Sequence, residues 1–127
     1  MVEKKDQKVK ANPATGSVTT YKHDGKLMDR FINLVHLSRK AGKLGLGFDN
    51  LERALAHHKC KIIIIAEDLA RNSYEKLERL IAERSVKVVR VGTKKRYGDE
   101  FGALEIGVLF ITDTNFAAGI MKILANQ

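Results

Sequence analysis

A chain of 127 residues with 44% hydrophobic and 30% charged side chains has the composition of one globular domain, which excludes a fibrous or wholly disordered protein. The formal net charge of +8 favours an anionic partner such as RNA, DNA or a membrane surface. The single cysteine, Cys60, excludes an internal disulfide and a cysteine-rich zinc cluster. The longest apolar run, Ile62–Ala66, is far shorter than the roughly 20 residues of a membrane-spanning helix. With no apolar leader either, the sequence predicts a cytoplasmic protein without a membrane partner.

The first 26 residues show no hydrophobic periodicity and contain the only proline, Pro13. Six lysines in this stretch stand against three carboxylates, and the apolar side chains are too few to offset the entropy cost of ordering. We expect residues 1–26 to form a flexible basic N-terminal tail, either a solubilising segment or a sequence-independent RNA contact. Residues 27–127 are expected to form the folded domain.

From residue 27 onward, helical and strand patterns alternate along the chain. Helices are predicted over 27–41, 48–58, from 72 onward and over 115–125, and strands over 43–46, 61–66, 86–91 and 106–112. Residues 72–75 have the form of a capping box, and 93–98 predict a short basic helix or turn. The alternation predicts an α/β fold, with helices on both faces of a small sheet.

The stretch from Arg39 to Ala66 contains the features that point most directly to a function. Lysine and arginine residues lead into alternating glycines, which allow the backbone to approach another surface closely. A helix then begins, and its free N–H groups and positive dipole end suit a phosphate. Asp49, Asn50 and Arg53 fall on roughly one face of this helix and offer acceptor, mixed and donor groups. We interpret the start of this helix as the centre of a nucleic-acid contact.

Basic side chains are concentrated near this helix and after the third predicted strand. Arg39, Lys40 and Lys43 precede the helix, Arg53 lies on it, and residues 94–96 are all basic. The alternative interpretation is that these charges are scattered for solubility. Without tryptophan, and with Tyr97 as the candidate aromatic, a stacking platform for single strands is disfavoured. A structured RNA, contacted through its shape, its phosphates and a few base edges, fits better.

The sequence gives little evidence for a catalytic, metal or cofactor site. Cys60 lies near His57 and His58, and a Cys–His pair can form a nucleophilic thiolate, but histidines at a helix end are also favoured by the dipole alone. Asp29 and His36 are expected on a solvated helix face. The glycines at 45 and 47 lack the third glycine of a dinucleotide fingerprint, and no phosphate-binding loop motif is present. We therefore expect no catalytic residue, no metal and no cofactor.

An ordered set of segments resembles the kink-turn-binding ribosomal protein superfamily (L7Ae/L30e type), and more narrowly its bacterial YlxQ/YbxF-like branch. The matching segments lie at 41–55, 61–68, 70–73, 86–88, 92–98 and 111–117. The resemblance implies a three-layer α-β-α sandwich with a four-stranded mixed sheet. It also implies a non-catalytic, monomeric protein that binds kink-turn RNA, a helix–bulge–helix element bent at tandem sheared G·A pairs, with the ribosome as one setting.

The resemblance also implies which residues touch RNA. The glycine before the second helix and the polar residues of its first turn would contact the G·A guanines, although the archaeal pattern has Asn-Glu where this chain has Asp49-Asn50. A later loop would cover an extruded nucleotide, with apolar packing from Leu104 or Ile106. The expected RNA-binding residues are Arg39, Lys40, Lys43, Gly47, Asp49, Asn50, Arg53, Lys94, Leu104, Glu105 and Ile106. The alternative is a protein-interaction module whose RNA site has decayed, which the swapped Asp49-Asn50 order and Glu105 favour.

Overall fold

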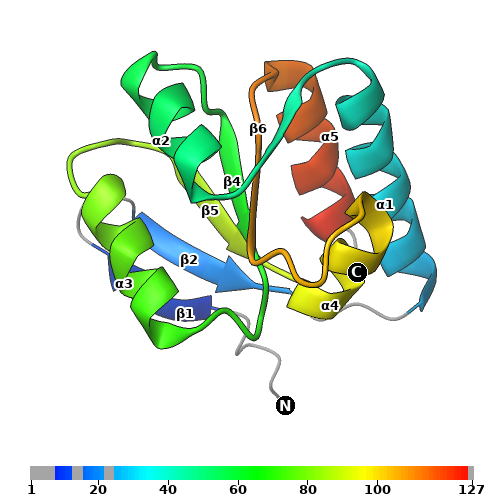
Figure 1. The fold of residues 1–127 in the computed structure, drawn as a ribbon, viewed down its shortest axis with the longest axis horizontal. Helices are drawn as coiled ribbons and strands as arrows, with labels where there is room; N and C mark the ends of the chain where they lie inside the picture. Colours follow the sequence, from blue (N-terminus) through cyan, green and yellow to red (C-terminus); the bar gives the residue numbers. More distant parts are fainter. Residues whose placement is uncertain (1–7, 13–15, 22–24, 126–127) are drawn as a thin grey trace.

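The computed structural model describes residues 8–12, 16–21 and 25–125, which form one mixed sheet between two layers of helices (Figure 1). The strands are β1 (Lys8–Asn12), β2 (Gly16–Thr20), β3 (Leu44–Leu46), β4 (Ile62–Ile65), β5 (Lys87–Arg90) and β6 (Val108–Ile111). The helices are α1 (Gly25–Lys40), α2 (Phe48–Ala56), α3 (Arg71–Leu80), α4 (Lys94–Phe101) and α5 (Thr114–Ala125). The predicted α/β class and mixed sheet are therefore confirmed.

Two hydrophobic cores lie on opposite faces of the sheet, and strand β4 contributes to both. Ile62 and Ile64 belong to the core that includes side chains of α1, α4 and α5. Ile63 and Ile65 belong to the core that includes side chains of α2 and α3. Successive side chains of a strand point to opposite faces, so a strand covered on both sides needs an unbroken apolar run. This arrangement makes the fold a three-layer sandwich.

The sheet has six strands, in the order β1-β2-β5-β4-β6-β3, whereas the resemblance implies four. The two additional strands come from the region for which the sequence predicts a flexible tail. Strand β2 pairs in parallel with β5, with Val18 opposite Val88, and β1 pairs antiparallel with β2. The prediction of a flexible tail is wrong for these two strands. Residues 1–7, 13–15 and 22–24 of the predicted tail lie outside the described residues.

The N-terminal strands form because β5 offers them a partner. Without β2, the backbone donors and acceptors along β5 would be unpaired at a sheet edge. The N–H of Tyr21 continues this pairing by donating to the carbonyl of Arg90 at 2.8 Å. Val18 and Tyr21 are also buried, with 2% and 8% of their surfaces exposed. Two apolar side chains are too few to produce a periodic pattern, so the sequence alone does not indicate a strand.

From residue 25 onward the predicted boundaries agree with the structure to within two residues, except at the end of α4, and two local details differ. Helix α3 begins without the predicted capping box: Ala70 is its N-cap residue, and the Glu75 carboxylate accepts from Arg71 Nε at 3.2 Å instead. Residues 93–98 belong to a longer helix, α4, in which Thr93 Oγ1 accepts from the N–H of Arg96 at 3.1 Å.

Strand β3 forms the sheet edge opposite β1 and leads directly into α2. It pairs antiparallel with β6, placing Gly45 opposite Phe110. A side chain at Gly45 would overlap the Phe110 ring, so this close pairing requires glycine. The start of α2 is thereby held at a fixed place beside the sheet edge.

Within the described ranges, none of the helices combines the length and apolar character that a membrane crossing requires.

Candidate nucleic-acid interface

Helix α2 begins at an open turn formed by Gly47. This residue has φ 84° and ψ 167°, a conformation that is strained for residues other than glycine. Its N–H donates to the carbonyl of Val108 at 3.0 Å, and its own carbonyl accepts from the N–H of Leu51 at 3.1 Å. A Cβ at Gly47 would meet no atom within 4 Å. The turn is therefore fixed to both the sheet and the helix, while its outer side is open to an incoming ligand.

The three polar residues predicted on the first turns of α2 lie together on its exposed face. Asn50 Nδ2 donates to the carbonyl of Leu46 at 2.9 Å, and Asn50 Oδ1 accepts from the Arg53 guanidinium. Among the described residues, none forms a hydrogen bond or ion pair with the Asp49 carboxylate. Asn50 thus organises the turn and orients Arg53, whereas Asp49 remains available to accept from an N–H group such as the guanine amino group.

A cationic hollow of about 500 Å³ lies beside this turn, between the end of α1 and strand β3. Arg39, Lys43 and Asn50 line it. The Arg39 guanidinium also lies 5.4 Å from the centre of the Phe101 ring, and the Lys43 carbonyl accepts from the N–H of Thr112 at 2.9 Å. Within the described part of the chain, neither cation is paired with a carboxylate. Both charges are therefore available to an anion.

Two of the predicted cations lie outside this cationic hollow. Lys40 lines a different depression on the surface of α1. Lys94 lies at the start of α4, where its N–H donates to Asp68 Oδ1 at 2.9 Å and its Nζ lies 3.7 Å from Glu105 Oε1. The charge of Lys94 is consequently shared with a carboxylate before any ligand binds.

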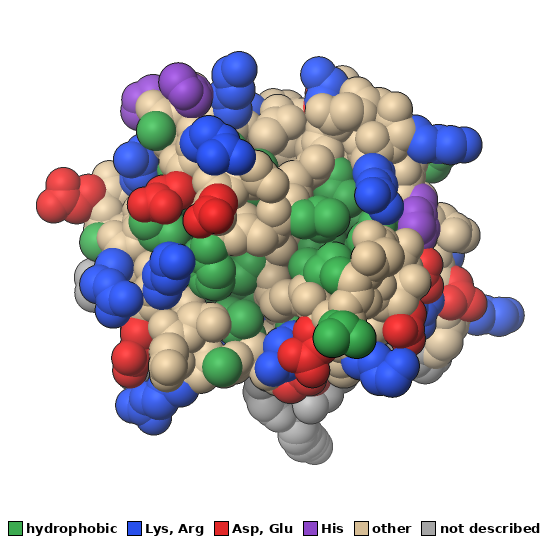
Figure 2. Space-filling view, in the orientation of Figure 1, with side chains coloured by type: hydrophobic (Ala, Val, Ile, Leu, Met, Phe, Trp, Pro, Cys, Tyr) green, Lys and Arg blue, Asp and Glu red, His purple; other side chains and the backbone are tan. Residues whose placement is uncertain are grey.

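An apolar hollow, also of about 500 Å³, lies on the other side of Gly47, toward α3 and α4. Figure 2 shows hydrophobic side chains in the middle of this face, with charged side chains around them. Ile106 lines this hollow and packs against the core, and its N–H donates to the carbonyl of Lys94 at 3.1 Å. Leu104 does not line the hollow and is 92% exposed. Of the two residues predicted for apolar packing, only Ile106 provides it in this structure.

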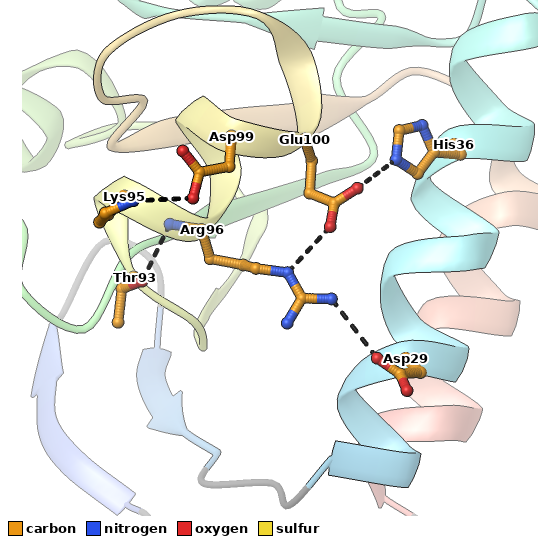
Figure 3. Close-up of polar contacts among 7 residues, drawn as sticks. All are labelled: Asp29, His36, Thr93, Lys95, Arg96, Asp99 and Glu100. Atoms are coloured by element: carbon orange, nitrogen blue, oxygen red, sulfur yellow. Dashed lines mark hydrogen bonds and ion pairs between the residues drawn. The ribbon is translucent and has the colours of Figure 1, made fainter.

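A polar network fixes α4 against α1 (Figure 3). Glu100 Oε1 lies 2.7 Å from His36 Nε2, and Glu100 Oε2 accepts from Arg96 Nε at 3.0 Å. Arg96 also reaches Asp29 Oδ1 at 3.5 Å. The hydrogen bond from His36, followed by the contacts with Arg96, holds the pKa of the Glu100 carboxyl below its usual value. Asp29 is exposed, as the sequence predicts, but its carboxylate and the His36 ring also contact side chains of α4, which the sequence does not predict.

This network affects the candidate site because α4 forms part of the wall of the apolar hollow. The His36 ring lies 4.7 Å from the Phe101 ring, and Phe101 lines the apolar hollow. On the inner side of α4, the Tyr97 hydroxyl donates to the carbonyl of Val91 at 2.5 Å, and the side chain is fully buried. Tyr97 therefore anchors α4 and cannot serve as a stacking surface for a base.

The chemistry of Cys60 does not support nucleophilic catalysis. Burial raises the pKa of the Cys60 thiol to about 12, so almost no thiolate is present at neutral pH. His57 and His58 are exposed at the end of α2. In the described ranges no three His, Cys, Asp or Glu side chains are grouped so as to hold a metal ion.

These features define a binding domain: a three-layer α/β sandwich whose second helix starts, at an open glycine turn, between a cationic and an apolar hollow. The sequence matches the ribosomal protein L7Ae/L30e/S12e/Gadd45 family over residues 29–120, and the chain belongs to this family. No match to the sequences of curated proteins was found.

Solved structures with the same fold include two informative neighbours. A protein with unknown function from Bacillus halodurans C has a TM-score of 0.68 and 20% sequence identity, and the match covers 76% of this chain and 98% of that protein. The 15.5 kD RNA-binding protein of Giardia lamblia has a TM-score of 0.61 and 18% identity, and the match covers 81% of this chain and 88% of that protein.

Proposed function

We propose that this chain is a non-catalytic RNA-binding protein that recognises kink-turn-type structured RNA through the start of α2. The observation that carries the proposal is the Gly47 turn, where open backbone, the free Asp49 carboxylate and the cations of the neighbouring hollow meet. Membership of the L7Ae/L30e/S12e/Gadd45 family and the fold shared with the Giardia RNA-binding protein support RNA as the partner.

The proposed mechanism is stabilisation of one RNA conformation. A sharply bent RNA brings its phosphates close together, so the bent state is disfavoured unless cations offset the repulsion. Arg39, Lys43 and Arg53 provide this charge on one side of the turn. Because the protein binds the bent state better than the extended one, binding shifts the population toward the bent state.

The base contacts follow from the hydrogen bonds around α2. Asn50 is engaged with Leu46 and Arg53, so its role is to hold the turn and to aim the guanidinium at a phosphate or a guanine edge. Asp49 accepts from the guanine amino group. The apolar hollow lined by Ile106 covers an unstacked nucleotide, and Glu105 is kept from repelling phosphate by its pairing with Lys94.

A titration with two RNAs tests this function. The first is a consensus kink-turn, and the second is identical except that both G·A pairs are replaced by Watson–Crick pairs. We expect clearly tighter binding of the first, measured by fluorescence anisotropy at physiological salt. Equal affinity for the two RNAs would rule out kink-turn recognition.

The alternative function is a protein-interaction module on the same fold. The observation that favours it is Leu104, a large apolar side chain with 92% of its surface exposed beside the candidate site. Repeating the titration at low salt separates the two functions, because such a module would bind neither RNA.

The cellular setting forms a second part of the proposal. We place the protein in the bacterial YlxQ/YbxF-like branch of the family, acting as a monomer in the cytoplasm, with ribosomal RNA as one expected target. Sequencing the RNA that co-purifies with the protein identifies that target directly.

A further inference from the structure

We propose that a second hollow, at the opposite end of α2 from Gly47, binds the phosphates of another segment of the RNA. This hollow has a volume of about 840 Å³ and lies between the ends of α2 and α3 and the start of β4. We call it the distal hollow. The proposal rests on the RNA-binding function proposed above and extends the RNA contact beyond the predicted residues.

The lining of the distal hollow is strongly cationic. Lys61 and Arg79 line it with exposed side chains. Arg84 is partly buried, and its Nη1 donates to the carbonyl of Leu55 at 2.8 Å, which closes the end of α2 and fixes the guanidinium at the wall. Glu83 is the one acidic residue of the lining. A phosphate entering the hollow would meet three permanent cations and a single carboxylate.

Among the described residues, Lys61 and Arg79 lack the carboxylate partners that the cations of α4 have. On α4, Lys95 lies 2.9 Å from Asp99 and Arg96 lies 3.0 Å from Glu100, so each charge is offset within its own helix. Within the described residues, neither Lys61 nor Arg79 is paired with a carboxylate. Surface charge that serves only solubility is usually interspersed in sign. An unpaired group of cations around one hollow instead fits a polyanion.

The residue at the rim of the distal hollow supports a binding role. His58 has φ 56°, a left-handed conformation that ends a helix and that glycine adopts at the lowest cost. Its N–H donates to the carbonyl of Leu55 at 3.1 Å. A histidine at this position keeps the backbone strain. Its imidazole side chain adds an N–H donor to the lining of the hollow, since an imidazole carries at least one N–H whether it is neutral or protonated. Figure 2 shows His, Lys and Arg side chains gathered over this end of α2.

The distal hollow is close enough to the Gly47 turn for one RNA to reach both. Helix α2 has nine residues, which at a rise of 1.5 Å per residue gives a length of about 13 Å. A base-paired stem entering at Gly47 therefore has only a short distance to cover along α2. We infer that the backbone of one stem follows α2 and places its phosphates against Lys61, Arg79 and Arg84.

Two double variants of the full chain, each removing two positive charges, test this contact. Lys61→Gln with Arg79→Gln removes exposed cations of the distal hollow. Arg30→Gln with Lys122→Gln is the matched control, because these exposed cations lie on α1 and α5 in the opposite helix layer. Binding to the consensus kink-turn with extended stems is measured from low to high salt, and thermal unfolding checks that both variants are folded.

We expect the distal-hollow variant to bind at least about tenfold more weakly near 0.1 M salt, with a salt slope shallower by about 1.8, because two phosphate contacts are lost. The control should change affinity by less than about twofold and keep the parent slope. Glu83→Gln should act in the opposite direction and tighten binding. If the two double variants behave alike, the distal hollow does not contact RNA.

The same measurements separate this proposal from the function on which it rests. Phosphate contacts carry no base information, so the distal-hollow variant should lose affinity equally for the kink-turn and for the RNA with replaced G·A pairs. A parent protein that fails to discriminate the two RNAs contradicts kink-turn recognition. If the two double variants still differ in that case, the distal hollow stands as a general RNA contact.

Discussion

At the residue scale, Asp49 and Asn50 differ in their hydrogen bonding: Asn50 is bonded within the protein, whereas the Asp49 carboxylate has no partner among the described residues. The sequence places both on the first turn of α2 but does not show that the Asn50 amide turns back onto the Leu46 carbonyl. That hydrogen bond depends on how β3 enters the helix through Gly47, which is a property of the fold. The swapped order of the acidic and amide residues is therefore compatible with RNA recognition, with Asp49 as the free acceptor.

Asp49→Ala should consequently weaken kink-turn binding by about 1–3 kcal/mol, because it removes an acceptor for a base edge. Stability should change little, since Asp49 is exposed and unpaired among the described residues. Anisotropy titration and thermal unfolding measure the two effects. Glu52→Ala is the control, because Glu52 is an exposed carboxylate on the same helix, about one turn further from Gly47. Equal losses from the two variants would contradict the assigned role of Asp49.

At the element scale, the position of α4 depends on contacts that the sequence does not reveal. His36 and Glu100 are 64 residues apart in the chain, and Arg96 and Asp29 are 67 apart. Periodicity identifies a helix face but not the element that faces it, which is why Asp29 and His36 are predicted on a solvated surface. The network holds Phe101 in the wall of the apolar hollow, so it acts on the candidate site from a distance.

Glu100→Gln tests this network through its pH dependence. The folded-state pKa of Glu100 is lowered, so its stabilising effect is present above the unfolded-state pKa and is lost as the pH falls through the folded-state value. At pH 7 the variant should be less stable by at most about 1 kcal/mol, since the pair is partly exposed. Near pH 3 the difference from the parent should shrink.

Urea denaturation at the two pH values measures the effect of Glu100→Gln. Asp99→Asn serves as the control, because among the described residues Asp99 pairs with exposed Lys95 of the same helix and should contribute less. A Glu100→Gln deficit that persists unchanged at low pH would show that the carboxylate charge is not the source of stabilisation.

The N-terminal strands β1 and β2 are elements that sequence periodicity does not detect. From residue 25 onward, clear periodicity locates the helices and strands, because each element buries a long apolar stripe or face. Strand β2 buries Val18 and Thr20 and is stabilised by pairing with β5, some 70 residues later in the chain. The low apolar content of residues 1–26 as a whole hides such a short buried segment, so the sequence predicts a flexible tail.

Val18→Ala distinguishes a strand from a tail. Val18 is 2% exposed and packs in the core shared by α2 and α3, so its truncation should lower the free energy of unfolding by about 1–3 kcal/mol. Thr19→Ala, at the neighbouring and less buried position, should cost less. Chemical denaturation gives both values. An unchanged stability for Val18→Ala would mean that β2 is not part of the folded domain.

At the scale of the whole molecule, the position of each cation matters more than the net charge of +8. Arg39 and Lys43 lie next to the start of α2, because only a tight turn separates the end of α1 from strand β3. The sequence does not show that Lys94 faces Glu105, because the loop after α4 has no periodicity to fix its path. Nor does it indicate the distal hollow, whose cations come from three separate segments.

The salt dependence of RNA binding should reflect this difference between free and paired cations. Arg39→Gln with Lys43→Gln removes two unpaired charges from the cationic hollow, so the slope of log affinity against log salt should become shallower by about 1.8. Lys94→Gln should change the slope by clearly less than the roughly 0.9 expected per phosphate contact, because Glu105 already offsets this charge. Glu105→Gln provides the opposite control: it frees Lys94 and should steepen the slope. If Lys94→Gln instead costs as much per charge as the cationic-hollow variant, the Lys94–Glu105 pair opens when RNA binds, and all the cations near α2 act as one surface.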